Sequence, residues 1–431
     1  MPLMQRRKFL IATSTLIAAG ATATPKAFAQ AKAAETSFPG LDAASNDEAW
    51  QSIQDLYEVD RSIANLENGY WGIMARPVFE DYLENTRRVN RENTIYARST
   101  FGKDFEGVRQ VVAEAVGAEP EEIALTRGAT EALQILIAGY NKLEPGDTVL
   151  YSDLDYDSMQ YAMASLEKRR GVSVKTFAIP EPATHDNVLE TYRKVLAETP
   201  KAKLLLLTHL SHRTGLVMPI SEIAEMAREK GVDVIVDAAH SWGQIDFNVR
   251  DLKSDFVGFN LHKWIGAPVG MGFFYIARDR LADIDTYLGD KDWSQDDIRA
   301  RVHTGTTNFA AALSVPAAIK LHQTITAASK QARLTYLRNY WVEKLRDQKG
   351  LEILTPDEPS MHAGITSFRF TDKTSKEDND AIVSELRDKH KVLTTRRADV
   401  SQGQCIRVSP ALYTTQVEMD QLVAALKTML A

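Results

Sequence analysis

Short apolar runs alternate with amphipathic stretches between about residues 122 and 240, and this alternation constrains the fold more than any other feature. The apolar runs are EIALT, DTVLYS, VSVKTFAI, KLLLLTHL and VDVIVDAA. Stretches with helical periodicity separate them, such as ATEALQILIAGYNKL and ISEIAEMAREKG. This order is typical of βαβ units. It predicts a buried, mostly parallel sheet whose ligand site lies at the carboxyl ends of its strands.

The pattern changes after Asn308, which indicates a second domain. A long helical stretch over residues 310–350 leads into GITSFRF, a further helix, VLTTRR, CIRVSP and a closing helix from Gln416. Short strands mixed with helices predict a small α+β domain. We therefore expect a large domain at residues 71–310 and a small C-terminal domain at residues 311–431. The N-terminal segment at residues 30–70 should join the small domain.

The first 29 residues have the layout of a cleavable export signal. The pair Arg6–Arg7 and the following KFL resemble the twin-arginine motif, an apolar stretch follows, and AFA precedes Gln30. An anchor helix is the alternative, but the apolar stretch is shorter than the ~20 residues that a membrane span needs. We expect the twin-arginine export machinery to deliver the chain to the periplasm or the medium, without membrane attachment after cleavage. This route carries folded proteins, which suggests that a cofactor is inserted before export.

Charge and cysteine content exclude several classes of function. Without residues 1–29 the chain has 47 basic and 58 acidic residues, a net charge of −11. It has no basic stripe, so nucleic acid is not an expected partner, and anionic lipid surfaces should repel it. Cys405 is the single cysteine, which excludes an internal disulfide and a cysteine-built metal site. We expect no metal.

Two charged residues stand in the most apolar part of the sequence. Asp237 ends the run VDVIVDAA, and Lys263 lies between His262 and Trp264. An acid at a strand end can be a helix cap. A buried, unpaired lysine, however, costs several kcal/mol unless its pKa falls or its nitrogen reacts with a carbonyl. A lysine that attacks a carbonyl must be neutral, and an apolar setting favours that state.

The segment TRGATEAL, Thr126 to Leu133, follows a strand and opens a helix. Its small residues leave backbone N–H groups free at a helix N-terminus, where an anion is favoured, and Thr130 adds a hydroxyl. The glycine spacings of a Walker A loop or a dinucleotide fingerprint are absent. A phosphate cradle, an acid at a strand end and a reactive lysine are the three groups that hold pyridoxal 5′-phosphate.

From about Leu66 to the C-terminus the chain resembles the class V aminotransferase family of fold-type I pyridoxal-phosphate enzymes. It is most similar to the isopenicillin N epimerase-like branch, which includes cysteine desulfurase and selenocysteine lyase relatives. The motifs TRGATEAL, SHRTGLVMP, VDAAHSWG, HKWIGAPVGMGFFY, HTGTTNFAA and IRVSPALYTT carry the resemblance. It implies an α/β fold with a large domain built on a mostly parallel seven-stranded sheet and a small C-terminal α+β domain.

The resemblance also implies roles for individual residues. Lys263 corresponds to the lysine that forms a Schiff base with the cofactor, and Asp237 to the partner of the pyridinium nitrogen. His240 corresponds to a group near the ring oxygen and the imine. Gly128, Ala129 and Thr130 would form the phosphate cradle, and His262 would lie next to the phosphate or the Schiff base. Tyr156 would stack on the ring, and His212 would donate a hydrogen bond to the phenolic oxygen.

Further residues would contact the substrate or a second subunit. Arg407 resembles an arginine that clamps the substrate carboxylate in a bidentate fork. Thr306 resembles a threonine that reaches the phosphate of a neighbouring subunit, so a homodimer is implied. Asn68, Tyr70 and Trp71 lie where relatives have a loop that faces the substrate. The structural alternatives are a surface ion pair for Arg407 and core packing for the ENGYWG loop.

The sequence departs from its relatives at two positions. Arg213 stands where relatives carry a small or apolar residue, and it could bind an acidic group of the substrate or pair with Asp155 or Asp157. Cys405 lies on a predicted strand rather than on a mobile loop, which argues against persulfide chemistry and favours a small core residue.

The resemblance implies an enzyme that acts at the amino-bearing carbon of a small-molecule amino substrate. Exported relatives that mature pyoverdine siderophores suggest an amino-acid-derived metabolite, modified by transamination or oxidative deamination. An epimerase or racemase is the first alternative. A non-catalytic protein that binds the cofactor is the second, from another functional class.

Overall fold

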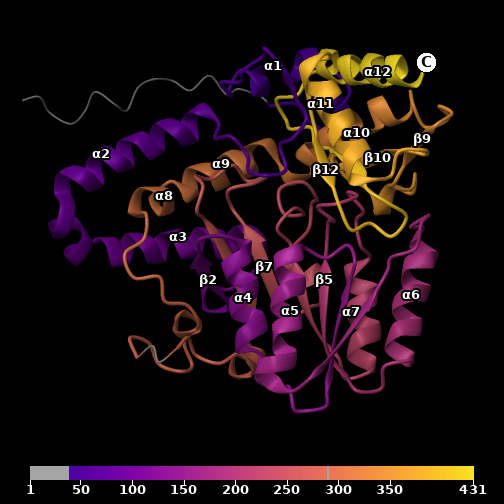
Figure 1. The fold of residues 1–431 in the computed structure, drawn as a ribbon. Helices are drawn as coiled ribbons and strands as arrows, with labels where there is room; N and C mark the ends of the chain where they lie inside the picture. Colours follow the sequence, from indigo (N-terminus) through magenta and orange to yellow (C-terminus); the bar gives the residue numbers. More distant parts are fainter. Residues whose placement is uncertain (1–37, 289–290) are drawn as a thin grey trace, which may run out of the picture. The chain divides into compact units, whose positions relative to one another are not determined.

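The computed structural model describes residues 38–288 and 291–431 (Figure 1). The predicted export signal lies outside the described residues. Among the helices of the described part, none combines the length and the apolar character that crossing a bilayer requires.

The larger sheet has seven strands in the order β2-β8-β7-β6-β5-β3-β4. The five strands from β7 to β4 run parallel, whereas β8 is antiparallel to both β2 and β7. The predicted mostly parallel sheet is therefore confirmed. Its strands are β2 Ile123–Thr126, β3 Thr148–Ser152, β4 Ser173–Phe177, β5 Ala202–Thr208, β6 Asp233–Asp237, β7 Phe256–Asn260 and β8 Gly272–Ile276.

Both faces of this sheet are covered by helices. Successive strand residues contribute to different hydrophobic clusters: Ile235 packs with the α4–α5 side, whereas Val234 and Val236 pack on the opposite side. Side chains alternate across a strand, so a sheet buried on both faces needs continuous apolar runs, which the sequence has. The helices that follow the strands are α4 Ala129–Gly139, α5 Asp157–Arg170, α6 His185–Ala197 and α7 Ile220–Glu229.

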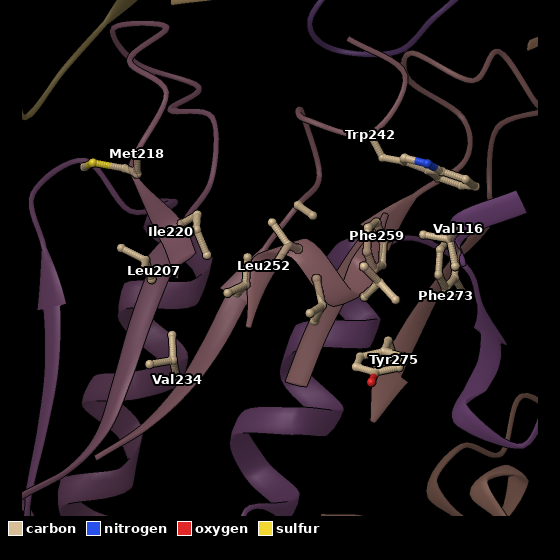
Figure 2. Close-up of a cluster of buried hydrophobic side chains, with 14 of the residues drawn as sticks. Val116, Leu207, Met218, Ile220, Val234, Trp242, Leu252, Phe259, Phe273 and Tyr275 are labelled. Carbon is tan, nitrogen blue, oxygen red and sulfur yellow. The ribbon is translucent and has the colours of Figure 1, made fainter. Parts of the chain in front are cut away.

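An aromatic group lies in the core on the side opposite α4 and α5 (Figure 2). The rings of Phe259 and Phe273 stack with centroids 4.4 Å apart, and Trp242 meets both rings edge-on. Phe259 belongs to β7 and Phe273 to β8, the strands that flank the HKWIGAPVG segment. The packing therefore fixes both ends of the segment that carries Lys263.

The stretch predicted as one long helix after Asn308 forms three helices: α8 Phe309–Leu313, α9 Val315–Ile325 and α10 Ala327–Val342. Pro316 stands in the first turn of α9. Thr326, with φ of 73°, separates α9 from α10, and its side chain accepts a hydrogen bond from the N–H of Ser329. A proline and a capping threonine with positive φ both end a helix.

The partners of these helices change at Thr326. Helices α8 and α9 pack on α2 Arg76–Ser99 and α3 Phe101–Val116, and their apolar residues join the core of the large sheet. Helix α10 packs instead on α12 Gln416–Leu430. The predicted domain boundaries stay a prediction.

The second sheet is antiparallel, in the order β12-β13-β10-β9, as expected for a small α+β domain. A short parallel pair, β1 with β11, links the N-terminal segment to this part of the chain. Helix α1 Asp47–Gln54 precedes β1, and α11 follows β10. The remaining bounds are β1 Ala64–Asn65, β9 Leu351–Ile353, β10 Thr366–Phe370, α11 Lys376–Asp388, β11 Val392–Leu393, β12 Thr395–Arg397 and β13 Cys405–Val408.

Candidate active site

A pocket of about 550 Å³ lies at the carboxyl ends of the parallel strands. Thr208, Asp237 and Asn260, the last residues of β5, β6 and β7, line it. The N-terminal loop, the start of α4, the loops after the strands and the second sheet also contribute to the lining. This is the position that the alternating sequence pattern predicted for a ligand site.

Asp237 is buried at the end of β6, where it pairs in register with Thr208 of β5. Its Oδ1 accepts a hydrogen bond from the N–H of Ala239 over 2.9 Å. Burial raises the pKa of Asp237, and this effect outweighs the opposing influence of that hydrogen bond and of Lys263. A cationic group in the pocket would therefore be favoured next to this carboxylate.

Lys263 lies on the loop between β7 and β8, and its amine reaches into the same pocket. Its Nζ lies 3.0 Å from Nε2 of His240. Burial lowers the pKa of Lys263 to about 8, although Asp237 acts in the opposite direction. Nδ1 of His240 accepts a hydrogen bond from the indole nitrogen of Trp264 over 3.3 Å. The structure thus brings together Asp237, His240 and Lys263, as predicted.

The N-terminus of α4 borders the pocket through Gly128, Ala129 and Thr130. The three residues are brought together as predicted, but Ala129 is not free to bind an anion through its backbone. Its N–H donates to Oδ1 of Asn260 over 2.8 Å. Among the described residues, the N–H and the hydroxyl of Thr130 have no hydrogen-bond partner and are available to a ligand. A side chain at residue 128 would crowd Asn260 and His262, so glycine allows the close approach of α4 to this loop.

Three aromatic side chains surround the same space. Nδ1 of His262 lies 2.8 Å from the carbonyl oxygen of Met271 and donates to it, since a carbonyl oxygen can only accept. The rings of His212 and Tyr156 meet edge-on, with centroids 5.2 Å apart. Burial and nearby cations lower the pKa of His212 well below its ordinary value. All three predicted residues line the pocket.

Arg407 lines the pocket but is only 1% exposed, and its guanidinium is already occupied. Its Nη2 lies 2.5 and 2.7 Å from the two carboxylate oxygens of Glu67, and its Nη1 donates to the carbonyl oxygen of His212. A Cβ at residue 69 would lie 2.5 Å from Nη2, so Gly69 makes room for the guanidinium. The guanidinium predicted to clamp the substrate carboxylate therefore holds the carboxylate of Glu67 in this structure. The ion pair of Arg407 and Glu67 is buried, unlike the surface pair considered from the sequence.

Arg213 does not reach the pocket. It is buried and binds Asp157, the carbonyl oxygen of Ala398 and, at 3.3 Å, Asp399. Pairing with Asp157, one of the two roles considered from the sequence, is what the structure shows. Asp155 instead accepts hydrogen bonds from Ser152 and Thr208. Substrate binding by Arg213 is not supported, because its guanidinium lies between chain segments.

The ENGYWG loop divides into packed and pocket-lining residues. Asn68 is buried, and its side-chain nitrogen donates to the carbonyl oxygens of Asn65 and Ser409. Its Oδ1 accepts a hydrogen bond from the hydroxyl of Tyr413. Its predicted substrate contact is therefore replaced by the core-packing alternative. Tyr70 and Trp71, by contrast, line the pocket and are exposed.

Thr306 is exposed and does not line the pocket of this chain. The predicted role for this residue requires a second subunit, so it stays a prediction. Cys405 is buried on β13, and burial raises the pKa of its thiol to about 11. A protonated, buried thiol packs as a small core residue.

Residues of this site that sequence reasoning missed include Glu67, Asn260, Trp264 and Arg397. Asn260 was recognisable as a polar residue at a strand end, the same signal that identified Asp237. Trp264 was noticed only as an apolar neighbour of Lys263. Glu67 and Arg397 are brought together at the pocket by long-range packing, which no local pattern indicates.

Comparison with known proteins agrees with this architecture. The family model described as aminotransferase class V matches residues 76–422. Isopenicillin N epimerase of Streptomyces clavuligerus is 27% identical over 397 residues, covering 88% of this chain and 97% of that protein. The epimerase of Amycolatopsis lactamdurans is 28% identical, with 88% and 98% covered. Cysteine desulfurase of Haloferax volcanii is 26% identical, with 75% and 78% covered.

Solved structures show the same fold. A structure of the lyase C-DES with glycine covalently linked to its pyridoxal-phosphate cofactor has a TM-score of 0.75 and 24% identity, covering 85% of this chain and 96% of that one. Cysteine desulfurase of Thermococcus onnurineus has a TM-score of 0.74 and 21% identity, covering 85% and 94%.

Proposed function

Because the chain belongs to the class V aminotransferase family of pyridoxal 5′-phosphate enzymes, we propose that it acts at the amino-bearing carbon of an amino acid or an amino-acid-derived metabolite. The observation that carries this proposal is the position of the Lys263 amine, which lies 3.0 Å from Nε2 of His240 in a pocket that also contains the carboxylate of Asp237. Burial there lowers the pKa of Lys263 to about 8. A lysine amine that is partly neutral near pH 8 can react with a carbonyl.

The residues of the pocket fit the cofactor. Lys263 would hold its aldehyde carbon, Asp237 its pyridine nitrogen, and the start of α4 its phosphate. Nδ1 of His212 is buried and has no hydrogen-bond partner among the described residues, as expected for a nitrogen that faces a ligand. Oδ2 of Asp237 likewise accepts no hydrogen bond from the described part of the chain, which leaves it for the ring nitrogen.

When bound, the cofactor withdraws electrons and so weakens the bonds to the amino-bearing carbon. The chain supplies the base. Nζ of Lys263 can take a proton from that carbon and return it, because burial lowers its pKa to about 8. Nε2 of His240, 3.0 Å away, orients the amine. Neutral His240 and His212 add no positive charge that would compete with this proton transfer.

Transamination or oxidative deamination is the reaction that we favour, with siderophore tailoring as a suggested setting. Both begin with loss of the proton from the amino-bearing carbon, which Lys263 can accept. The later steps differ, because transamination passes the amino group to a keto acid, whereas oxidative deamination consumes dioxygen. Cys405, the single cysteine, is buried in β13 and does not line the pocket, which supports either reaction over persulfide chemistry.

Epimerisation is the second candidate. The similarity to the isopenicillin N epimerases favours it, since this chain matches 97% and 98% of the length of those two proteins. In that reaction a proton leaves one face of the carbon and returns to the other. The second face needs its own donor. Tyr156, which lines the pocket, and a water molecule are the chemical groups to consider for that role.

One experiment separates these reactions. Cofactor-loaded protein is incubated with a panel of amino acids in deuterated water, and products are analysed by mass spectrometry. Keto product together with the amine form of the cofactor supports transamination, and keto product with oxygen consumption supports oxidative deamination. Deuterium at the amino-bearing carbon without keto product supports epimerisation. If no amine changes the cofactor's spectrum or gains deuterium, the proposal is wrong and a non-catalytic binding protein is the better account.

Export and dimerisation belong to the same proposal. The twin-arginine-like segment supports periplasmic location, and amino-terminal sequencing of the mature protein should then begin at Gln30. The exposed position of Thr306 supports a homodimer in which this residue meets the partner's pocket. Sedimentation of the purified protein at twice the monomer mass is the expected result.

A further inference from the structure

Three arginines line the pocket, and two of them have hydrogen-bonded partners among the described residues. The exposed Arg127 donates to Glu131. Arg407 is held by both oxygens of Glu67 and by the carbonyl oxygen of His212. The side chain of Arg397 makes no hydrogen bond to any described residue, and its nearest anion is Oε1 of Glu67, 3.6 Å from Nη2. Its Nε is buried without a partner in that part of the chain. A half-buried guanidinium without hydrogen bonds is costly, so a carboxylate that completes its hydrogen bonds would be favoured here.

Strand pairing fixes the direction of Arg397. In the antiparallel pair of β12 and β13, Arg397 lies opposite Cys405 and Thr395 lies opposite Arg407. Paired residues share a face and neighbours alternate, so Arg397 and Arg407 are on the same face of this ribbon. Arg396 is on the other face, where it binds Asp380 and Gln404.

Arg213 holds the segment that comes directly after Arg397. It donates to the carbonyl oxygen of Ala398 and pairs with Asp157 and Asp399. The backbone beside Arg397 is therefore tied to the loop after β5. The side chain of Arg397 is 24% exposed, against 1% for that of Arg407, so it is the more accessible of the two arginines.

We propose that Arg397, rather than Arg407, binds the acid group of the substrate, and that Glu67 excludes a second acid group from this end of the pocket. The inference rests on the proposed function and names its substrate class: an amine with one carboxylate that reaches Arg397. Glu67 and the two arginines carry a net charge of +1, which one incoming carboxylate neutralises. A second carboxylate near Arg407 would meet Glu67 and be repelled.

The test uses propionate and succinate, which have no amino group and cannot react with the cofactor. Their dissociation constants for the cofactor-loaded protein are measured by calorimetry. Arg397→Gln should weaken propionate binding about tenfold or more, because a charge-assisted hydrogen bond is lost. Arg397→Lys keeps the charge but loses the planar fork, so an intermediate loss is expected. Arg396→Gln, a neighbour on the opposite face, is the matched control and should bind as the wild type does.

Glu67→Gln tests the second half of the proposal. This substitution should make succinate bind about tenfold more tightly than in the wild type, because the repelling charge is removed and Arg407 becomes available. Unchanged propionate binding in both Arg397 variants would overturn the role of Arg397. Unchanged succinate binding in Glu67→Gln would overturn the exclusion. Neither readout requires turnover, so cofactor-loaded protein that binds these acids as expected but turns over no amine would refute the proposed function and not this inference.

Discussion

The indole nitrogen of Trp264 donates a hydrogen bond to Nδ1 of His240 over 3.3 Å, which places the proton of the neutral histidine on Nε2. Nε2 lies 3.0 Å from Nζ of Lys263, so the lysine nitrogen must accept this hydrogen bond through a lone pair. Only the neutral amine has that lone pair. Trp264 and burial therefore favour the same state of Lys263, the one that reacts with a carbonyl.

A pH dependence results from this arrangement. The pKa of Lys263 is lowered to about 8, so the amine is protonated and unreactive below that pH and neutral above it. The rate of cofactor attachment to cofactor-free protein should rise with pH and level off above about pH 8. Trp264→Phe releases Nδ1 of His240, so Nε2 can accept from a protonated lysine and the midpoint should move to higher pH. A wild-type midpoint near that of a free lysine would contradict this account.

Asp237→Asn should weaken cofactor binding and activity. The carboxylate is buried at a strand end, and its charge is what would favour a protonated ring nitrogen. An amide of the same shape removes that charge, and the loss of one charge-assisted hydrogen bond is about 1.5–3 kcal/mol, or roughly 10- to 150-fold in affinity. Equilibrium dialysis against the cofactor measures the change. Affinity equal to that of the wild type would show that Asp237 has no such role.

Gly72→Ala should damage the site although residue 72 does not line the pocket. A Cβ there would lie 2.0 Å from the carbonyl oxygen of Lys263, and the N–H of Gly72 donates to the carbonyl oxygen of His262. The lysine loop must therefore move, and cofactor uptake should fall. Gly107→Ala is the control, since nothing lies within 4 Å of its Cβ position inside α3. That variant should gain up to about 1 kcal/mol of stability from helix propensity. Equal cofactor uptake by both variants would argue against a tight contact at Gly72.

Arg213→Met should lower the free energy of unfolding in urea by about 1–3 kcal/mol, because hydrogen bonds from a buried charged group are lost. The loss stays moderate because the two acids left behind are exposed, with side chains of Asp157 42% and Asp399 75% accessible. Arg193→Met, at an exposed ion pair on α6, should change stability by less than about 0.5 kcal/mol. If the two variants were equally stable, Arg213 would not tie the segment beside Arg397.

The large sheet and the polar residues that gather at its strand ends were predictable from the sequence. The strand ends are recognisable, because a polar residue after an apolar run, such as Asp237, must lie at the edge of a buried sheet. Lys263 and the start of α4 lie one turn or loop from such ends.

The resemblance indicated Arg407 and the ENGYWG loop at the acid-binding end of the pocket, but the pairing of Glu67 with the arginines there was not predictable. Glu67 precedes β2 by more than fifty residues, Arg397 and Arg407 are on a separate sheet, and only tertiary packing brings them together. A local pattern cannot reveal that Arg407 already has a carboxylate. Likewise, the helix break at Thr326 depends on a positive φ that no periodicity predicts.

The most direct test of the central claim is to locate the cofactor on the chain. The cofactor-loaded protein is reduced with borohydride, digested and analysed by mass spectrometry, with Lys263→Ala as the control. The account predicts a pyridoxyl-phosphate group on the peptide that contains Lys263, and no modified peptide from the variant. A modified lysine elsewhere in the wild-type protein, or no modified lysine at all, would contradict it.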